Sequence, residues 1–295
     1  MPGSERPSAG TSPHWLVPYL RLVRAPAVFS ALGDPLTGML VARGGLEPAR
    51  AARVAAAAAS LYLSGMALND LADREEDARE RPDRPIPSGA VSPEAAAWVG
   101  MGLAAAGVCA ATRTGAAFSG LGVAGAVLAY NFALKTTPAG PAMMGACRTL
   151  SLLMGAQAAG GARGVGRAAY SALLLGGYVA GLTILARGET ESGGPSHAVP
   201  GAALAGVALG GAALRGGKCS LPWIAAVAVL AGPAVVRAVR RASPGTTGPA
   251  VGAMIRAIPA FDAALAAPRA PVLAAVVALP LLALSRWGRR LIPIS

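Results

Sequence analysis

The stretch NDLADREEDARERPDRPIPSG occupies residues 69–89 and interrupts a chain otherwise rich in Ala, Gly, Leu and Val. Seven of the 14 acidic residues of the protein lie inside it, between Asp70 and Asp83. The stretch follows a long apolar run, so it is expected where a membrane helix leaves the bilayer. Such a concentration of carboxylates in so apolar a chain indicates a function, and we interpret that function as binding a divalent cation and, through it, a diphosphate.

The spacing of the aspartates supports this interpretation. Asp70, Asp73 and Asp77 stand at i, i+3 and i+7, which places them on one face of an α-helix, and Asn69 borders that face. Like charges at this spacing repel, whereas Mg²⁺ takes oxygen ligands and is usually held by one or two carboxylates plus substrate phosphates. Asp70, Asp73 and Asp77 are therefore the predicted metal ligands and catalytic residues. A merely solvated acidic loop is the alternative.

Composition sets the class of protein. With 295 residues, a mean hydropathy of +0.52, 54% hydrophobic residues and 14% charged residues, the chain reads as an all-α, polytopic membrane protein. The net charge of +12 would suggest a nucleic-acid partner in a soluble protein. Here the basic residues lie between apolar segments, where they set the orientation of a membrane protein. No nucleic-acid partner is therefore expected. The three cysteines lack metal-binding spacing and are expected to pack as small apolar residues.

Apolar runs near the ~20 residues that cross a bilayer recur along the chain. Residues 1–13 are polar and expected to be disordered, with no removable signal peptide, and residues 14–295 are expected to form a single helical domain. The stretch 247–267, with Arg256 and Asp262, is either a further span or a helix in the membrane interface. The other expected spans are 15–43, 48–73, 93–112, 115–134, 140–160, 165–186, 197–214, 219–240 and 270–287.

The distribution of basic residues predicts orientation in the cell membrane. The loops on the side of the aspartate-rich stretch hold Arg74, Arg79, Arg81, Arg84, Lys135, Arg187, Arg237, Arg240 and Arg241. The opposite loops hold Arg43, Arg50, Arg53, Arg113, Arg163, Arg167, Arg215 and Lys218. This modest bias favours a multi-pass protein with a cytoplasmic amino terminus and a site facing the cytoplasm. Arg286, Arg289 and Arg290 also favour a cytoplasmic carboxyl end, which requires an even number of spans.

Several charged residues lie inside or at the ends of apolar segments. Asp34, beside Pro35, is either functional or a helix-pairing or kink residue. Arg148 lies within a span and must face a polar cavity or a carboxylate. Lys135 ends a span, where it either snorkels to the headgroups or binds an anion. Arginine and lysine side chains neutralise diphosphates, and the predicted substrate-binding residues are Asn69, Arg84, Lys135, Arg148 and Arg187.

At residues 69–89 the chain resembles the UbiA superfamily of intramembrane prenyltransferases, most of all its EboC-type branch. Asn69-Asp70-x-x-Asp73-x-x-x-Asp77 matches the first aspartate-rich motif of the superfamily, and the tail at 81–89 is typical of it. The resemblance extends from about residue 16, strongly over 65–92 and weakly after 200. It implies about nine transmembrane helices around a central cavity. It also implies a second motif after the sixth helix, where the two motifs together hold Mg²⁺ and a polyprenyl diphosphate.

The chain departs from the superfamily at two places. The second motif usually contains Asp-x-x-x-Asp, but this chain has Arg187-x-Glu189-x-Glu191, and residues two apart do not share a helix face. Glu189 and Glu191 are the candidates for the second motif if they adopt a loop conformation. The usual Arg-Pro-x-Asn of the first segment is replaced by Arg-Ala-Pro-Ala at 24–27.

The implied chemistry is Mg²⁺-assisted ionisation of the diphosphate, followed by attack of a lipid-soluble acceptor, aromatic or otherwise, on the allylic cation. Tyr62, Tyr130 and Tyr178 are candidates to stabilise that cation or to pack. His197 is expected to begin a helix. Three functions stay open at this point: a prenyltransferase, an isoprenoid-binding carrier or assembly component without turnover, and a small-solute transporter. The scarcity of polar residues in the other spans argues against the third.

Overall fold

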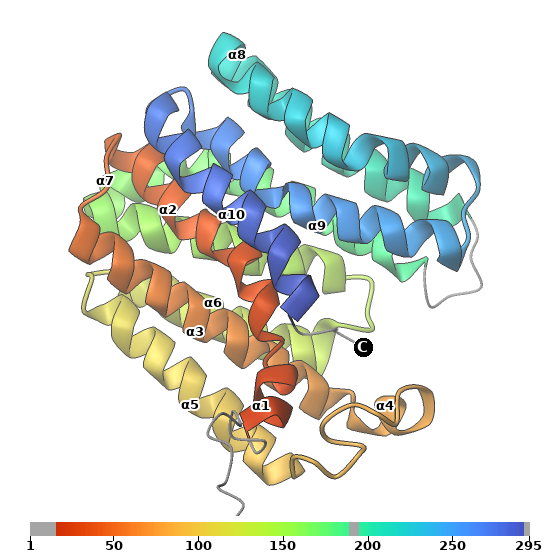
Figure 1. Cartoon of the computed structure of the whole chain (residues 1–295). Coiled ribbons are helices and arrows are strands. Elements are labelled where there is room, and N and C mark those ends of the chain that lie inside the picture. Colours follow the sequence, from red (N-terminus) through yellow and green to blue (C-terminus); the bar gives the residue numbers. More distant parts are fainter. Residues whose placement is uncertain (1–15, 189–194, 292–295) are drawn as a thin grey trace, which may run out of the picture.

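The computed structural model describes residues 16–188 and 195–291, which form a bundle of helices without strands (Figure 1). The expected disordered segment at 1–13 lies outside these ranges. The helical elements are α1 (Leu16–Leu22), η1 (Ala25–Val28), α2 (Phe29–Arg43), α3 (Pro48–Ala72), α4 (Arg74–Glu80), α5 (Pro93–Thr112), α6 (Ala117–Ala129), η2 (Tyr130–Leu134), α7 (Gly140–Arg187), α8 (Pro195–Arg240), α9 (Pro244–Ala266) and α10 (Pro271–Leu291).

The helices α7 and α8 contain 48 and 46 residues and are each divided by a glycine. Gly161 has φ 55° and ψ −144°, and Gly217 has φ 51° and ψ −137°, a conformation that side chains with a Cβ rarely adopt. The halves of α7 run antiparallel, because Gly145 packs on Gly176 near the open end of the hairpin and Gly164 packs near its turn. The separate segments expected at 140–160, 165–186, 197–214 and 219–240 are thereby confirmed.

The described chain forms ten helical segments of the bundle, namely α2, α3, α5, α6, α9, α10 and the two halves each of α7 and α8. They correspond to the nine expected runs and the stretch 247–267, and how many of them cross the membrane stays a prediction. The additional segment is α9, of whose most apolar window 72% is buried, so it is a helix of the bundle and not an interfacial one. An even number allows both ends of the chain to lie on one side, and Figure 1 shows the end of α10 on the side of α1 and α4.

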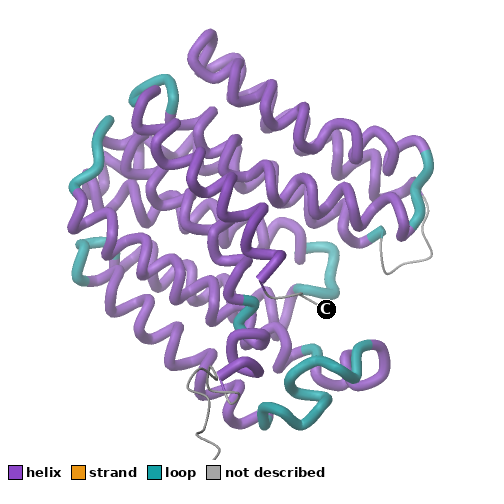
Figure 2. The backbone as a smooth tube through the Cα atoms, viewed as in Figure 1, coloured by secondary structure: helices purple, strands orange, loops and turns teal. Residues whose placement is uncertain are grey.

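The surface of the bundle is apolar, as expected for a membrane protein. Six helices are long and apolar enough to cross a membrane. Large apolar side chains on the outside are almost fully exposed, including Trp98 (79%), Phe118 (80%) and Leu214 (89%). Exposed apolar surface on this scale is unfavourable in water and marks the face that contacts lipid. The connecting loops gather at the two ends of the bundle (Figure 2).

The closest helix crossing joins α2 to the first half of α7. A Cβ atom on Gly155 would overlap the backbone carbonyl of Pro35, and one on Gly38 would overlap the carbonyl of Leu152. Small residues allow such close backbone approach in membrane bundles. This crossing positions both the Asp34 segment and Arg148.

Gly155→Ala is expected to destabilise the fold, because its methyl group forces α2 and α7 apart. Overpacking of this kind costs about 1–3 kcal/mol. The control is Gly166→Ala on the same helix, where a Cβ meets no atom within 4 Å. Thermal unfolding in detergent should show a lower midpoint for Gly155→Ala alone. Equal midpoints for the two variants would contradict the close crossing.

Candidate functional site

The aspartate-rich stretch leaves the end of α3 and folds back against it. The helix α3 ends at Ala72, and Asp73, with ψ 3°, turns the chain into the short helix α4. The expected single helical face for the three aspartates is therefore wrong beyond Asp73. The proline-rich segment from Arg81 to Ser92 is non-helical, as expected, and Ser92 caps α5 by accepting a hydrogen bond from the Ala95 amide.

Two of the aspartates converge on one arginine. Arg84 Nη1 lies 2.5 Å from Asp77 Oδ2 and 3.4 Å from Asp70 Oδ1, and Arg84 itself is 9% exposed. The side chains of Asp70 and Asp77 are 4% and 1% exposed. Arg81 lies 3.5 Å from the other oxygen of Asp77, which has no hydrogen-bond partner. The segment after α4 thus places the Arg84 guanidinium group between two buried carboxylates that would otherwise repel each other.

The third aspartate faces a different element. Asp73 pairs with Lys135, which follows η2. Asn69 donates to Asn131 Oδ1 at 3.1 Å, and Asn131 donates to the Gly65 carbonyl at 3.3 Å. The element η2 is a π-helix, a distortion that is frequent at functional sites because it redirects side chains. It brings Lys135 and Asn131 to the aspartate stretch from sequence positions about sixty residues away.

Arg24 belongs to this cluster and was not among the predicted site residues. Its Nη2 lies 2.7 Å from Asp70 Oδ1. Arg24 has φ 46°, the one positive φ of a non-glycine residue among the described residues, at the break between α1 and η1. Strained backbone of this kind persists only where the surrounding structure enforces it. The signal in the sequence was a basic residue inside the first apolar segment, two before Pro26.

The second predicted motif lies mostly outside the described residues. Glu189 and Glu191 fall in the range 189–194, which the structure does not describe. Arg187, at the end of α7, donates to the backbone carbonyls of Lys135 at 3.0 Å and of Thr137. It therefore holds the loop that carries Lys135, and it places the end of α7 beside the aspartate stretch.

Arg148 lies in a separate buried cluster. Its Nη2 is 2.8 Å from Asp34 Oδ1 and donates to the Ser30 carbonyl. Asp34 is fully buried, and the nearby Asp262 on α9 is 2% exposed without a hydrogen-bond partner for either carboxylate oxygen. No described contact joins Arg148 to the three aspartates. Arg148 thus satisfies the expectation that it faces a carboxylate and pairs α2 with α7, while its predicted contact with substrate stays a prediction.

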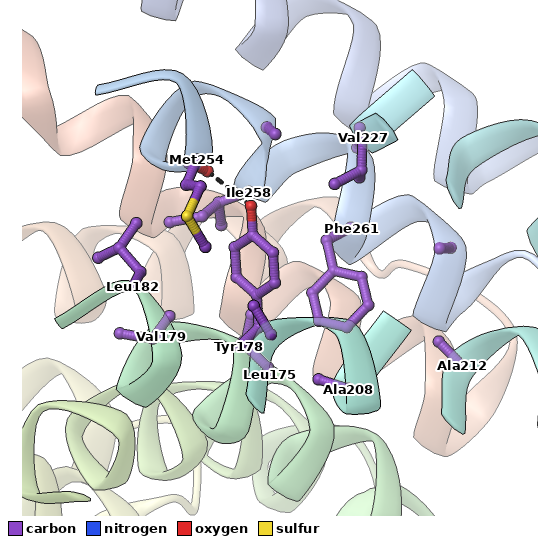
Figure 3. Packing of buried hydrophobic residues seen from close by; sticks show 14 of the residues in the cluster. Leu175, Tyr178, Val179, Leu182, Ala208, Ala212, Val227, Met254, Ile258 and Phe261 are labelled. Carbon is purple, nitrogen blue, oxygen red and sulfur yellow. Dashed lines mark hydrogen bonds between the residues drawn. The ribbon is translucent and has the colours of Figure 1, made fainter. Parts of the chain in front are cut away.

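The aromatic candidates differ in their surroundings. Tyr178 is 1% exposed, donates to the Met254 carbonyl at 3.0 Å and packs on Phe261 with ring centroids 4.9 Å apart (Figure 3). These contacts make Tyr178 a packing residue of the core. Tyr62 and Tyr130 are half-buried. Tyr130 begins η2 and so lies on the element that carries Asn131.

The donor set fits Mg²⁺. Asn69, Asp70, Asp73 and Asp77 offer only oxygen ligands of the kind this cation prefers. Asp77 Oδ1 is a buried carboxylate oxygen without a hydrogen-bond partner, which a cation would satisfy. In the described residues each carboxylate faces a basic side chain, and no three acidic, histidine or cysteine side chains form a metal cluster by themselves. The arrangement therefore suits a cation that arrives with a phosphate-bearing ligand, to which the basic side chains can turn.

The sequence profile of a known family covers most of the chain. The sequence profile of the UbiA prenyltransferase family matches residues 35–246. A digeranylgeranylglyceryl phosphate synthase from Methanopyrus kandleri is 38% identical over 122 residues, which are 41% of this chain and 45% of the relative. The chain thus matches less than half of the length of that curated relative.

Solved structures match the fold more completely. The apo structure of a UbiA homologue from Aeropyrum pernix K1 has a TM-score of 0.67 and 21% identity and covers 80% of this chain and 96% of that one. A UbiA homologue from Archaeoglobus fulgidus bound to GPP and Mg²⁺ has a TM-score of 0.57 and 12% identity, with coverages of 92% and 99%. At these identities the likeness establishes the fold.

Proposed function

The chain belongs to the UbiA prenyltransferase family, and we propose that it transfers a prenyl group from a polyprenyl diphosphate to a lipid-soluble acceptor in the membrane. The observation that carries the proposal is the convergence of Asp70, Asp73 and Asp77 with Arg24, Arg84 and Lys135 at one end of an apolar bundle. Fixed carboxylates for a cation, next to fixed cations for phosphate oxygens, suit a diphosphate. Mg²⁺ and a diphosphate bound to a solved neighbour support the same ligand class.

The residues of the site divide into two groups. The oxygens of Asn69, Asp70, Asp73 and Asp77 would hold Mg²⁺, which supplies charge stabilisation for the departing diphosphate. Arg24, Arg84, Lys135 and Arg187 would bind the phosphate oxygens, arginine through bidentate hydrogen bonds. The apolar bundle around them would exclude water from the allylic carbon. We place Glu189 and Glu191 in this site as well, because Arg187 brings the end of α7 to Lys135.

We also propose the cell membrane as the location, with the aspartate stretch facing the cytoplasm. The ten helical segments support this orientation, since an even number places both ends on the side with the larger excess of basic residues. Cysteine labelling with a membrane-impermeant reagent tests it. A cysteine at Arg79, in the exposed helix α4, is expected to be protected in intact cells, and one at Arg113 is expected to be labelled.

The experiment that tests the function is a transfer assay in lipid vesicles. Purified protein receives radiolabelled polyprenyl diphosphates of several chain lengths, Mg²⁺, and acceptors that include aromatic lipids, a lipid extract and a prenylglyceryl phosphate, the class suggested by the name of the curated relatives. A prenylated lipid product is expected, dependent on Mg²⁺. Binding of the diphosphate without product for any acceptor would assign the chain to isoprenoid carriers.

Tyr178→Phe is expected to leave turnover unchanged while it weakens the fold. The hydroxyl bonds a backbone carbonyl in the core, and losing such a bond costs about 0.5–1.5 kcal/mol. The phenyl ring that remains keeps the packing on Phe261. The transfer assay and thermal unfolding on the same preparation test this. A loss of turnover with unchanged unfolding would show that the Tyr178 hydroxyl acts in the reaction.

A further inference from the structure

A cavity of about 410 Å³ opens at the end of the bundle opposite α4. It lies between the end of α2, the turn of α7, the turn of α8 and the loop after α9, and three arginines line it: Arg167, Arg215 and Arg269. The loops at this end are far from the aspartate stretch (Figures 1 and 2). The cavity is therefore distinct from the candidate prenyl-transfer site.

Local contacts hold two of the arginines, and the third lies against the end of α2. Arg167 Nη1 donates to the Ala42 carbonyl at 3.2 Å. Arg215 stacks over the Tyr170 ring with its guanidinium carbon 5.0 Å from the centroid. The side chain of Arg269 lies beside Gly44, where a Cβ atom would be in ordinary contact with Arg269 Cγ at 3.5 Å. These contacts already restrict the arginine side chains, so little further side-chain entropy is lost when a ligand binds them.

The charge of the cavity is uncompensated. No acidic residue lines it, and none of its three arginines forms an ion pair with a carboxylate in the part of the chain that the structure describes. Glu47 is the acidic residue that the structure describes at this end of the bundle, and it pairs with Arg50 at 3.2 Å. Three guanidinium groups around one cavity create a positive potential that an anion with several oxygens satisfies.

Apolar surface adjoins the cavity. Leu214, next to Arg215, is 89% exposed, and Leu173, next to the lining residue Leu174, is 66% exposed. These side chains lie on helices that face lipid, so a ligand with a phosphate in the cavity could extend acyl chains along them. Basic pockets between membrane helices bind anionic headgroups on the cytoplasmic or matrix face. The same charge complementarity applies to anionic lipids of the opposite leaflet, which this cavity faces in the proposed orientation.

We propose that this cavity binds the phosphate group of an anionic membrane phospholipid, with its acyl chains along the exposed leucines of α7 and α8. The site is independent of the proposed prenyl transfer, since it shares no residue with the aspartate cluster. Its occupancy would link the ends of α2 and α9 and the turns of α7 and α8 through one headgroup.

The test measures lipid retention. Protein is purified from vesicles of phosphatidylcholine with a minor share of phosphatidylglycerol, and the bound lipids are quantified by mass spectrometry. Phosphatidylglycerol is expected to be enriched in the wild type. Arg167→Gln with Arg215→Gln is expected to lower the enrichment by about 25-fold, since each arginine contributes about fivefold. The matched control is Arg113→Gln, an exposed arginine at the same end of the bundle that does not line the cavity.

Two results would overturn the proposal. Unchanged enrichment in the double variant, or an equal loss in Arg113→Gln, would show that general surface charge retains the lipid. Displacement of the lipid by the same concentration of inorganic phosphate would show that free phosphate is the ligand. Thermal unfolding of the variants without added lipid should stay cooperative, with only the small drop in midpoint that follows from the lost Arg167 and Arg215 contacts, which separates lost binding from lost folding.

Discussion

Asp73→Asn is expected to reduce prenyl transfer by about 10²–10³-fold, the loss typical of removing one preorganised charge that stabilises a transition state. Asp73 pairs with Lys135 and has a side chain that is 16% exposed, so it is the most accessible of the three aspartates. The substitution keeps the shape of the side chain and removes its charge. The Mg²⁺ concentration for half-maximal turnover should rise, which distinguishes a metal ligand from a packing residue.

The matched control is Glu76→Gln, the same loss of charge three residues along the chain on the exposed side of α4. It should leave turnover and Mg²⁺ dependence unchanged. Asp73 has a second possible role, which is to hold Lys135 in place, and the variant Lys135→Gln distinguishes this role from metal binding. If Lys135→Gln reproduces the full effect and the double variant adds nothing, Asp73 acts only through the lysine and the metal assignment fails.

Arg84→Gln is expected to destabilise the protein by about 3 kcal/mol, the lower end of the cost of breaking a buried ion pair. The substitution leaves Asp70 and Asp77 buried and close together without the cation that separates them. Arg24 and Arg81 still compensate part of their charge, which keeps the loss near that lower end. A lower midpoint of thermal unfolding in detergent is the measurement.

The control for this variant is Arg79→Gln, an exposed arginine of α4 whose loss should not change the midpoint. Adding Asp77→Asn to Arg84→Gln removes one of the carboxylates and should restore much of the stability, because the remaining charges are again paired. Added Mg²⁺ should stabilise Arg84→Gln more than the wild type. Full stability of Arg84→Gln without Mg²⁺ would contradict the buried pairing of Arg84 with the two aspartates.

Most of the helix positions follow from the lengths of the apolar runs and from the Gly, Pro and Ser residues at their ends. The segment expected at 93–112 coincides with α5, because Ser92 and Pro93 mark its start. The turns of α7 and α8 fall at glycines between two runs of spanning length. The segment 247–267 stayed ambiguous because Arg256 and Asp262 lower its hydropathy, and its burial depends on neighbouring helices that hydropathy does not describe.

The candidate site was predictable in its local part only. The aspartates and Arg84 lie within one short stretch, so spacing and charge identified them. The ion pair between Arg24 and Asp70 spans 46 residues and depends on the strained break before η1. The role of Asn131 depends on the π-helix η2, which no periodicity reveals. Arg148 was recognised as needing a partner, but its pairing with Asp34 is a product of the close crossing of α2 and α7.

Pyrophosphate release tests the central claim most directly. Protein in detergent with a lipid extract receives radiolabelled polyprenyl diphosphates of several chain lengths, with Mg²⁺ or with a chelator, and wild type is compared with Asp73→Asn and Glu189→Ala. Release that matches prenylated product and requires both Mg²⁺ and Asp73 is the predicted result. Loss of release in Glu189→Ala would establish the second motif. Binding that requires Mg²⁺ and Asp73 without any release would contradict the enzyme and make the protein an isoprenoid carrier.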